Sequence, residues 1–158
     1  MNNESTPDQL LIQTTQINIL IVDDVLENIR LLSSILEHNG HQTRKAISGK
    51  MALTAVAASP PSLILLDIRM PEMNGYEVCQ QLKSNPETAD IPIIFLSASQ
   101  DMTDKGQAFR SGGADYITKP FYMEEVLARV QHQLTIIKYQ QTIFYLQSQV
   151  KELQAATK

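Results

Sequence analysis

The sequence has few of the features that mark secreted, membrane-spanning or nucleic-acid-binding proteins. Its 158 residues include a single cysteine, so no internal disulfide framework can form, which favours a reducing, cytoplasmic location. No apolar run is long enough to cross a bilayer, and the first residues lack a basic signal-peptide start. With 13 basic against 17 acidic residues and no basic cluster, we expect this segment to bind neither nucleic acid nor membranes directly.

The distribution of apolar residues divides the chain into three parts. Residues 1–15 are polar and show no periodicity, so we expect a flexible N-terminal arm. Residues 16–133 alternate short apolar runs with helical patterns and contain enough hydrophobic sequence for one globular domain. Residues 134–158 continue the last helical pattern without a break, which predicts a C-terminal helical extension.

Five strands and five helices alternate in the predicted domain. The apolar or β-branched runs that predict strands are 17–22, 41–47, 63–66, 91–96 and 115–118. A helix is expected after each strand; the first four end near Gly40, Pro60, Ser84 and Arg110, and the fifth runs from Met123 onward. The second strand is the most polar, which predicts an edge position. Such alternation is typical of an α/β fold with a parallel sheet.

Polar side chains follow four of these strands directly. They are Asp23 and Asp24 after the first strand, Asp67 after the third, Ser97 after the fourth and Lys119 after the fifth. The carboxyl ends of parallel strands meet at one edge of a sheet, where ligands bind. One acid at a strand end is usually a turn former or helix cap, but the occurrence at four strand ends favours a shared site.

The chemistry of these side chains indicates a cation and a phosphoryl group. Carboxylates within about 5 Å of one another repel by a few kcal/mol, so the cluster favours a bound cation. Oxygen ligands favour Mg²⁺ over zinc, for which the sequence has no suitable Cys or His spacing. Mg²⁺ and Lys119 would neutralise a phosphoryl group on one of the acids, and the Ser97 hydroxyl could donate to it.

Four sequence blocks, in this order and spacing, resemble the receiver domain of two-component response regulators. They are 23–24, 65–75, 94–98 and 113–121, within a region that covers roughly three quarters of the chain. The resemblance implies a flavodoxin-like, doubly wound, five-stranded parallel sheet with strand order 2-1-3-4-5. It also implies that Asp67 takes a phosphoryl group from a phosphohistidine on a sensor histidine kinase or a histidine phosphotransfer protein.

The resemblance further assigns roles around Asp67. Asp24, Asp67 and the backbone carbonyl of Arg69 would hold Mg²⁺, with Asp23 ordering the water shell of the metal. The peptide bond between Lys119 and the following proline is usually cis in the family, which the sequence permits.

A switch is implied by the same resemblance. A phosphoryl oxygen would draw the Ser97 hydroxyl inward, and Tyr116 would fill the vacated space, changing the face formed by helix four, strand five and helix five. From its own context, Tyr116 could equally be an aromatic residue packed at a sheet edge. Arg69 and Ser99 lie two residues after Asp67 and Ser97, where family members vary and side chains can control the lifetime of the acyl phosphate.

The C-terminal extension carries an apolar stripe with alternating spacings of three and four. This stripe, called the seam below, consists of Ile136, Tyr139, Ile143, Leu146, Val150 and Leu153. It predicts a parallel two-stranded coiled coil and therefore a homodimer. The alternative is that the helix folds back onto the receiver's own surface.

Three classes of function remain to be compared. Every motif supports a phospho-acceptor signalling domain, which we do not expect to be an enzyme in its own right. An alternative is that it forms the receiver part of a larger hybrid kinase or multidomain regulator. Phosphatases of the haloacid dehalogenase type use an Asp-x-Asp arrangement, but Arg69 stands at the position of the second acid. The third class is a receiver-like dimerisation module that works without phosphorylation.

Overall fold

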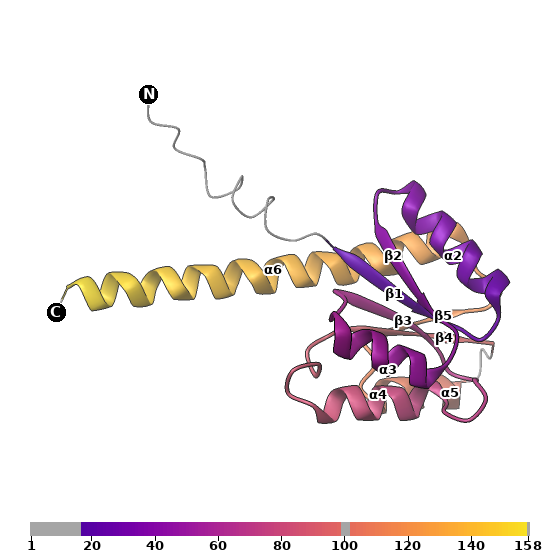
Figure 1. Cartoon of the computed structure of the whole chain (residues 1–158). Coiled ribbons are helices and arrows are strands. Elements are labelled where there is room, and N and C mark those ends of the chain that lie inside the picture. The colour runs from indigo at the N-terminus through magenta and orange to yellow at the C-terminus, as the bar shows by residue number, and fades with distance from the viewer. Residues whose placement is uncertain (1–16, 99–101, 158) are drawn as a thin grey trace.

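The structure is a computed structural model that describes residues 17–98 and 102–157, so the expected arm over 1–15 lies outside it (Figure 1). Strands and helices alternate along the chain. The strands are β1 (Asn18–Val22), β2 (Gln42–Ala46), β3 (Leu63–Asp67), β4 (Ile93–Ser97) and β5 (Asp115–Thr118). The helices are α2 (Leu26–His38), α3 (Gly49–Ala58), α4 (Gly75–Ser84), α5 (Met102–Arg110) and α6 (Met123–Ala156).

The five strands form one parallel sheet in the order β2-β1-β3-β4-β5, which confirms the predicted fold. Strands β3 and β4 are buried along their whole length, because helices cover both faces of the sheet. Strand β2 lies at an edge and carries exposed and half-buried polar residues, as its sequence predicted.

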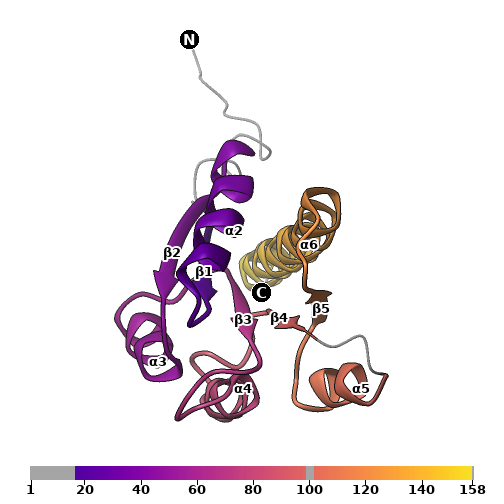
Figure 2. The ribbon, with the colours of Figure 1, turned by 90° about the vertical axis from the view of Figure 1, so that its right-hand side faces the viewer.

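Successive residues of each strand point to opposite faces of the sheet and enter two separate cores. Helices α2 and α6 cover one face, and α3, α4 and α5 cover the other (Figure 2). In β3, for example, Leu63 and Leu65 pack under α2 and α6, whereas Ile64 and Leu66 pack under α3 and α4. The sheet is therefore fixed from both sides, and its strand ends are rigid supports for a site.

Two local features explain where elements begin and end. Strand β4 begins at Ile93 rather than at Ile91, and the residue between them, Pro92, has no N–H to donate to the sheet. Its carbonyl still accepts a hydrogen bond from the Ile64 N–H at 3.0 Å. Gly40 follows α2 with a φ of +86°, the left-handed conformation that was predicted to end this helix.

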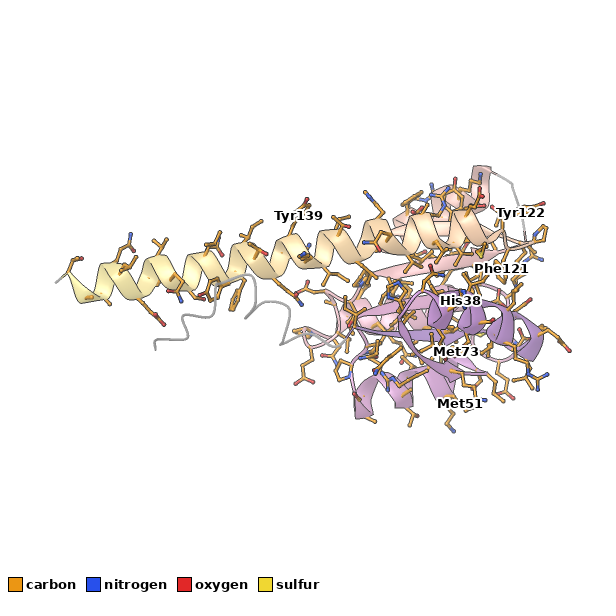
Figure 3. All side chains as sticks on the ribbon, turned by 90° about the horizontal axis from the view of Figure 1, so that it is seen from above. His38, Met51, Met73, Phe121, Tyr122 and Tyr139 are labelled. Carbon is orange, nitrogen blue, oxygen red and sulfur yellow. The ribbon has the colours of Figure 1, made fainter. Side chains whose placement is uncertain are left out.

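Helix α6 is continuous over 34 residues and has two environments. Its first half packs on the sheet through Val126, Val130 and Leu134. Its second half leaves the globular body at the sheet edge opposite the carboxyl ends of the strands (Figure 1). Tyr139 lies where the helix leaves the body, and its side chain points away from it (Figure 3). The described residues contain no helix long and apolar enough to span a membrane.

The structure does not show the fold-back considered for the extension. From Tyr139 to Leu153 each residue of the seam is more than half exposed, and only Ile136, nearest the receiver, is half-buried. The receiver therefore leaves most of the seam uncovered.

Candidate functional site

The carboxyl ends of the strands surround an open cleft of about 790 Å³. Four of the five residues expected at this edge line the cleft: Asp24, Asp67, Ser97 and Lys119. The fifth, Asp23, is fully buried and lies beside them, in contact with Lys119. The structure thus brings together all five side chains that the sequence placed after the strands.

Three carboxylates converge in this cleft. Asp23, Asp24 and Asp67 each offer an oxygen atom, and these atoms lie within 4.8 Å of one another. Asp24 is exposed, whereas Asp67 is only 3% exposed because it is the last residue of the central strand β3. The negative charges of these three carboxylates repel one another unless cations lie beside them.

Asp23 is fixed by residues at the start of α2. Its Oδ1 accepts a hydrogen bond from the Val25 N–H at 2.9 Å, and its Oδ2 accepts one from the Asn28 side chain at 3.0 Å. These two bonds hold the carboxylate of Asp23 in one orientation. Sequence reasoning missed Asn28, although its position about one helical turn beyond Asp23 was compatible with this contact.

Lys119 contacts two of the three acids. Its Nζ lies 3.1 Å from Asp67 Oδ1 and 3.4 Å from Asp23 Oδ2. Its backbone N–H donates to the Ser97 carbonyl at 2.7 Å, which connects the loop that follows β5 to the end of β4. The Lys119–Pro120 peptide bond is cis, as the resemblance implied.

The electrostatics of the cleft raise the pKa of Asp67 from its usual value of 3.8 to about 6. Burial is the main cause, and the neighbouring carboxylate of Asp23 adds to it. The hydrogen bond and charge of Lys119 act in the opposite direction but do not cancel the increase. Asp67 is therefore ionised at neutral pH but more basic than an ordinary carboxylate, which is a useful property in a nucleophile.

The loop after β3 is packed tightly against Asp67. The Gly75 N–H donates to the Ile68 carbonyl at 2.8 Å, and a Cβ atom at Gly75 would collide with the carbonyl oxygen of Asp67. Helix α4 then begins with a capping box, in which the Asn74 side chain accepts from the Glu77 N–H at 2.9 Å and Glu77 accepts from the Asn74 N–H. These contacts fix the end of β3 and with it the position of Asp67.

Other predicted residues lie around the rim of the cleft. Ser97 is buried at the end of β4, and Arg69 is exposed beside Asp67. Ser99, expected to modulate the site, lies outside the described residues. Gln107 of α5 also lines the cleft, and sequence reasoning missed it because no local pattern distinguishes it from other polar residues of that helix.

Tyr116 of β5 contacts side chains of α5 and α6. Its ring and that of Phe109 pack in a T-shaped arrangement, with ring centroids 5.7 Å apart. Lys105 of α5 places its Nζ 4.7 Å from the ring centroid, and Arg129 of α6 places its Cζ 5.4 Å away. Both cations are within the range of cation–π interactions, so the ring contacts two cations and one aromatic neighbour.

The comparisons with known proteins agree with this geometry. The response regulator receiver domain family matches residues 19–131, which contain all the residues of the cleft. The chain belongs to this family. A receiver domain of this kind is a signalling domain of two-component systems, and its strand order, acidic cleft and long C-terminal helix agree with that membership.

Three relatives show how the receiver domain is used elsewhere. The DNA-binding dual master transcriptional regulator RpaA of Synechocystis sp. is 42% identical over 72% of this chain and 47% of that protein. The response regulator PleD of Caulobacter vibrioides is 39% identical over 72% of this chain and 25% of PleD. The receiver domain of a signal transduction histidine kinase from Syntrophus aciditrophicus is 36% identical, with a TM-score of 0.69 over 75% of this chain and 89% of that one.

The chain spans less than half the length of the curated relatives just named. The similarity therefore concerns the receiver domain, and the attached parts of the relatives lie outside it.

Proposed function

We propose that Asp67 is the phospho-acceptor of this receiver domain. The observation that carries the proposal is the environment of its carboxylate, which is buried, raised in pKa to about 6, and held 3.1 Å from Lys119 beside two other acids. Among the three acids, Asp67 combines burial with access to the cleft, whereas Asp23 is fully buried with both oxygens already bonded.

The transfer proceeds by in-line displacement at phosphorus. An ionised oxygen of Asp67 forms a bond to phosphorus, and the P–N bond of a phosphohistidine breaks, leaving its electron pair on the imidazole nitrogen. The product is an acyl phosphate on Asp67. Hydrolysis reverses the modification, because a water oxygen bonds to phosphorus and the acyl oxygen leaves as the restored carboxylate of Asp67.

Side chains of this protein orient and stabilise the group. Lys119 supplies a fixed positive charge for a phosphoryl oxygen, and the Ser97 hydroxyl supplies a donor from the end of β4. The side chains of Arg69 and Ser99 control the access of water to the acyl phosphate on Asp67.

The acidic cluster fits Mg²⁺. Its ligands are carboxylate oxygens without Cys or His, and three acids face a single Lys119 ammonium, so the site favours a hard divalent cation. Asp24, Asp67 and the backbone carbonyl of Arg69 would hold the ion, with Asp23 ordering its water shell. When bound, Mg²⁺ supplies positive charge that neutralises phosphoryl oxygens.

The phosphoryl donor in this proposal is a sensor histidine kinase or a histidine phosphotransfer protein in the cytoplasm. The domain promotes its own phosphorylation and dephosphorylation and is not otherwise an enzyme. Residues 16–133 act as the receiver, while 134–158 form a helical dimerisation or output element. Phosphorylation moves Ser97 and Tyr116, which changes the α5–β5–α6 face and the attached helix.

The experiment that tests this proposal uses acetyl phosphate and Mg²⁺ with intact-mass measurement. We expect the wild-type protein to gain one phosphoryl group, Asp67→Asn to gain none, and Asp24→Asn to need a higher Mg²⁺ concentration. Glu152→Gln, which changes an exposed acid at the far end of α6, is the matched control and should behave as wild type. A phosphoryl group on Asp67→Asn would contradict the assignment.

The alternative function is a receiver-like dimerisation module that works without phosphorylation. The exposed seam of α6 is the observation that favours it. A protein that stays unmodified by acetyl phosphate under conditions that load another receiver, yet dimerises through the seam, would establish this alternative instead.

A further inference from the structure

Helix α6 has a second face of interest, on the side opposite the seam. Val130, Leu134 and Ile137 lie on the face that packs against the sheet. In further steps of four and three along the helix, this face continues to Gln141 and Phe144 on the projecting part. Phe144 is 73% exposed, the highest fraction among the large apolar side chains of the described residues. The face that packs on the sheet therefore extends beyond the sheet and is uncovered there.

A groove of about 400 Å³ lies between this face and the loop that joins α4 to β4. It is at the amino ends of β3 and β4, whereas the acidic cleft is at the carboxyl ends of the strands. Gln140 and Gln141 of α6 and Ser62 before β3 supply uncharged polar groups. The apolar lining of the groove consists of Pro86, Ile91, Pro92, Ile137 and Phe144.

The loop side of the groove is fixed by hydrogen bonds from α4. Lys83 Nζ donates to the Ala89 carbonyl at 2.8 Å and to the Ile91 carbonyl at 2.7 Å. The hydroxyl of the buried Thr88 donates to the Leu82 carbonyl at 2.7 Å. The loop is therefore held in shape by its own contacts, and a segment that binds in the groove does not have to order it.

The N-terminal part of the chain enters the sheet beside this groove. Strand β1 begins at the sheet edge where α6 leaves the globular body (Figure 1). The Asn18 N–H donates to Ser62 Oγ at 3.3 Å, and the Ser62 N–H donates to the Asn18 carbonyl at 2.9 Å. Ile17 and Ile137 pack against the same core. Because Ser62 lines the groove, the chain that precedes Ile17 starts from the groove wall.

The arm before Ile17 contains one run of apolar residues. The arm was expected to be flexible because most of its residues are polar. The run is the exception and consists of Leu10, Leu11 and Ile12. Five residues of extended chain, from Ile12 to Ile17, span up to about 17 Å, and α6 is about 10 Å long from Ile137 to Phe144. The run can therefore lie along the groove as far as Phe144.

Charge and connectivity favour this run as the occupant. Glu87 and Asp90 border the groove and would repel an acidic segment, but residues 9–16 carry no charge. Gln9 and Gln13 flank the run with amides that can both donate to and accept from groups on the groove wall. Because four residues separate the run from Ile17, its effective concentration at the groove is in the millimolar range, which a separate partner must exceed to displace it.

We propose that Leu10, Leu11 and Ile12 bind in the groove between α6 and the α4–β4 loop of the same chain. The bound run covers Phe144 and connects the projecting part of α6 to the receiver. At about 100° per residue the seam lies on the opposite side of α6, so it remains uncovered. The contact involves neither Asp67 nor the acidic cleft, so its test is independent of the proposed phosphorylation.

A single tryptophan tests the groove side of this contact. The sequence contains no tryptophan, so Phe144→Trp gives the whole chain one such fluorophore, in the groove. Addition of Leu11→Asp to this protein should move the emission to longer wavelengths and increase quenching by acrylamide. The ratio of bound to free arm should fall at least about 10-fold, which corresponds to the loss of one buried leucine side chain. The matched control Ser5→Asp adds the same charge to the arm outside the run and should change neither measurement.

A reciprocal reporter tests the arm side. The fluorophore of Leu11→Trp should be shielded from acrylamide in the otherwise wild-type chain, and addition of Phe144→Asp should expose it. Tyr145→Asp changes the next exposed residue of α6, which does not line the groove, and should leave the shielding unchanged.

Three results would overturn the proposal. The first is an emission of Phe144→Trp that is the same with and without Leu11→Asp. The second is an equal response of the Leu11→Trp fluorophore to Phe144→Asp and to Tyr145→Asp. The third is a shielding of the Phe144→Trp fluorophore that disappears on dilution, because a second copy of the chain, rather than the arm, would then cover the groove.

Discussion

Replacement of Asp67 by asparagine should stabilise the unphosphorylated protein when Mg²⁺ is removed by a chelator. The pKa of Asp67 is about 6 in the folded protein and 3.8 without its surroundings. The folded state therefore binds the proton more tightly, and the free energy of unfolding falls as pH rises from 3.8 through 6. The ionised carboxylate thus destabilises the folded protein at neutral pH, and a neutral amide of the same shape removes this effect.

The size of the effect follows from the same two values. At about pH 7.5 the carboxylate lowers the free energy of unfolding by up to about 3 kcal/mol, and at about pH 4.5 by only about 1 kcal/mol. Urea unfolding of wild type and Asp67→Asn at both pH values measures the two differences. Glu152→Gln serves as the control and should show neither.

A variant that is less stable than wild type at neutral pH would refute this reasoning. A gain of the same size at both pH values would also refute it, because the effect must disappear as Asp67 becomes protonated.

Substitutions at three other positions test neighbouring contacts. Lys119→Met should raise the pKa of Asp67 further, because the hydrogen bond and charge of Lys119 lower it. A ¹³C NMR titration of the Asp67 carboxyl group measures this pKa, and a lower or unchanged value would contradict the prediction. Gly75→Ala should destabilise the protein by about 1 to 3 kcal/mol in urea unfolding, because the added Cβ would push on the Asp67 carbonyl. It should also slow phosphorylation. Unchanged stability of this variant would contradict the close packing. Asn74→Ala should cost about 1 kcal/mol through loss of the α4 cap, and Asn74→Asp should retain most of it.

Much of the site was predictable because residues that follow the strands of a parallel sheet lie together at one edge of the sheet. Asp67 and Lys119 are 52 residues apart, yet both follow strands of one parallel sheet, so their contact at 3.1 Å follows from the alternation of strands and helices. The strand order itself came from the family resemblance. Apolar runs identify strands but do not specify which strand lies beside which.

Other contacts could not be predicted because they depend on how helices rotate and pack on the sheet. Gln107 reaches the cleft from α5, and Lys105 and Arg129 meet Tyr116 from two different helices. Nothing in the local sequence of these charged and polar residues distinguishes them from ordinary surface positions. The seam was visible as a pattern, but the sequence did not show that the receiver leaves most of it exposed.

The most direct test of the account is the location of the phosphoryl group itself. After phosphorylation with acetyl phosphate and Mg²⁺, reduction with borohydride converts a phosphorylated aspartate to homoserine, which peptide mapping identifies by mass. We expect homoserine at position 67 alone. Homoserine at Asp23 or Asp24, or a phosphoryl group on a histidine with Asp67 unmodified, would contradict the assignment of the acceptor.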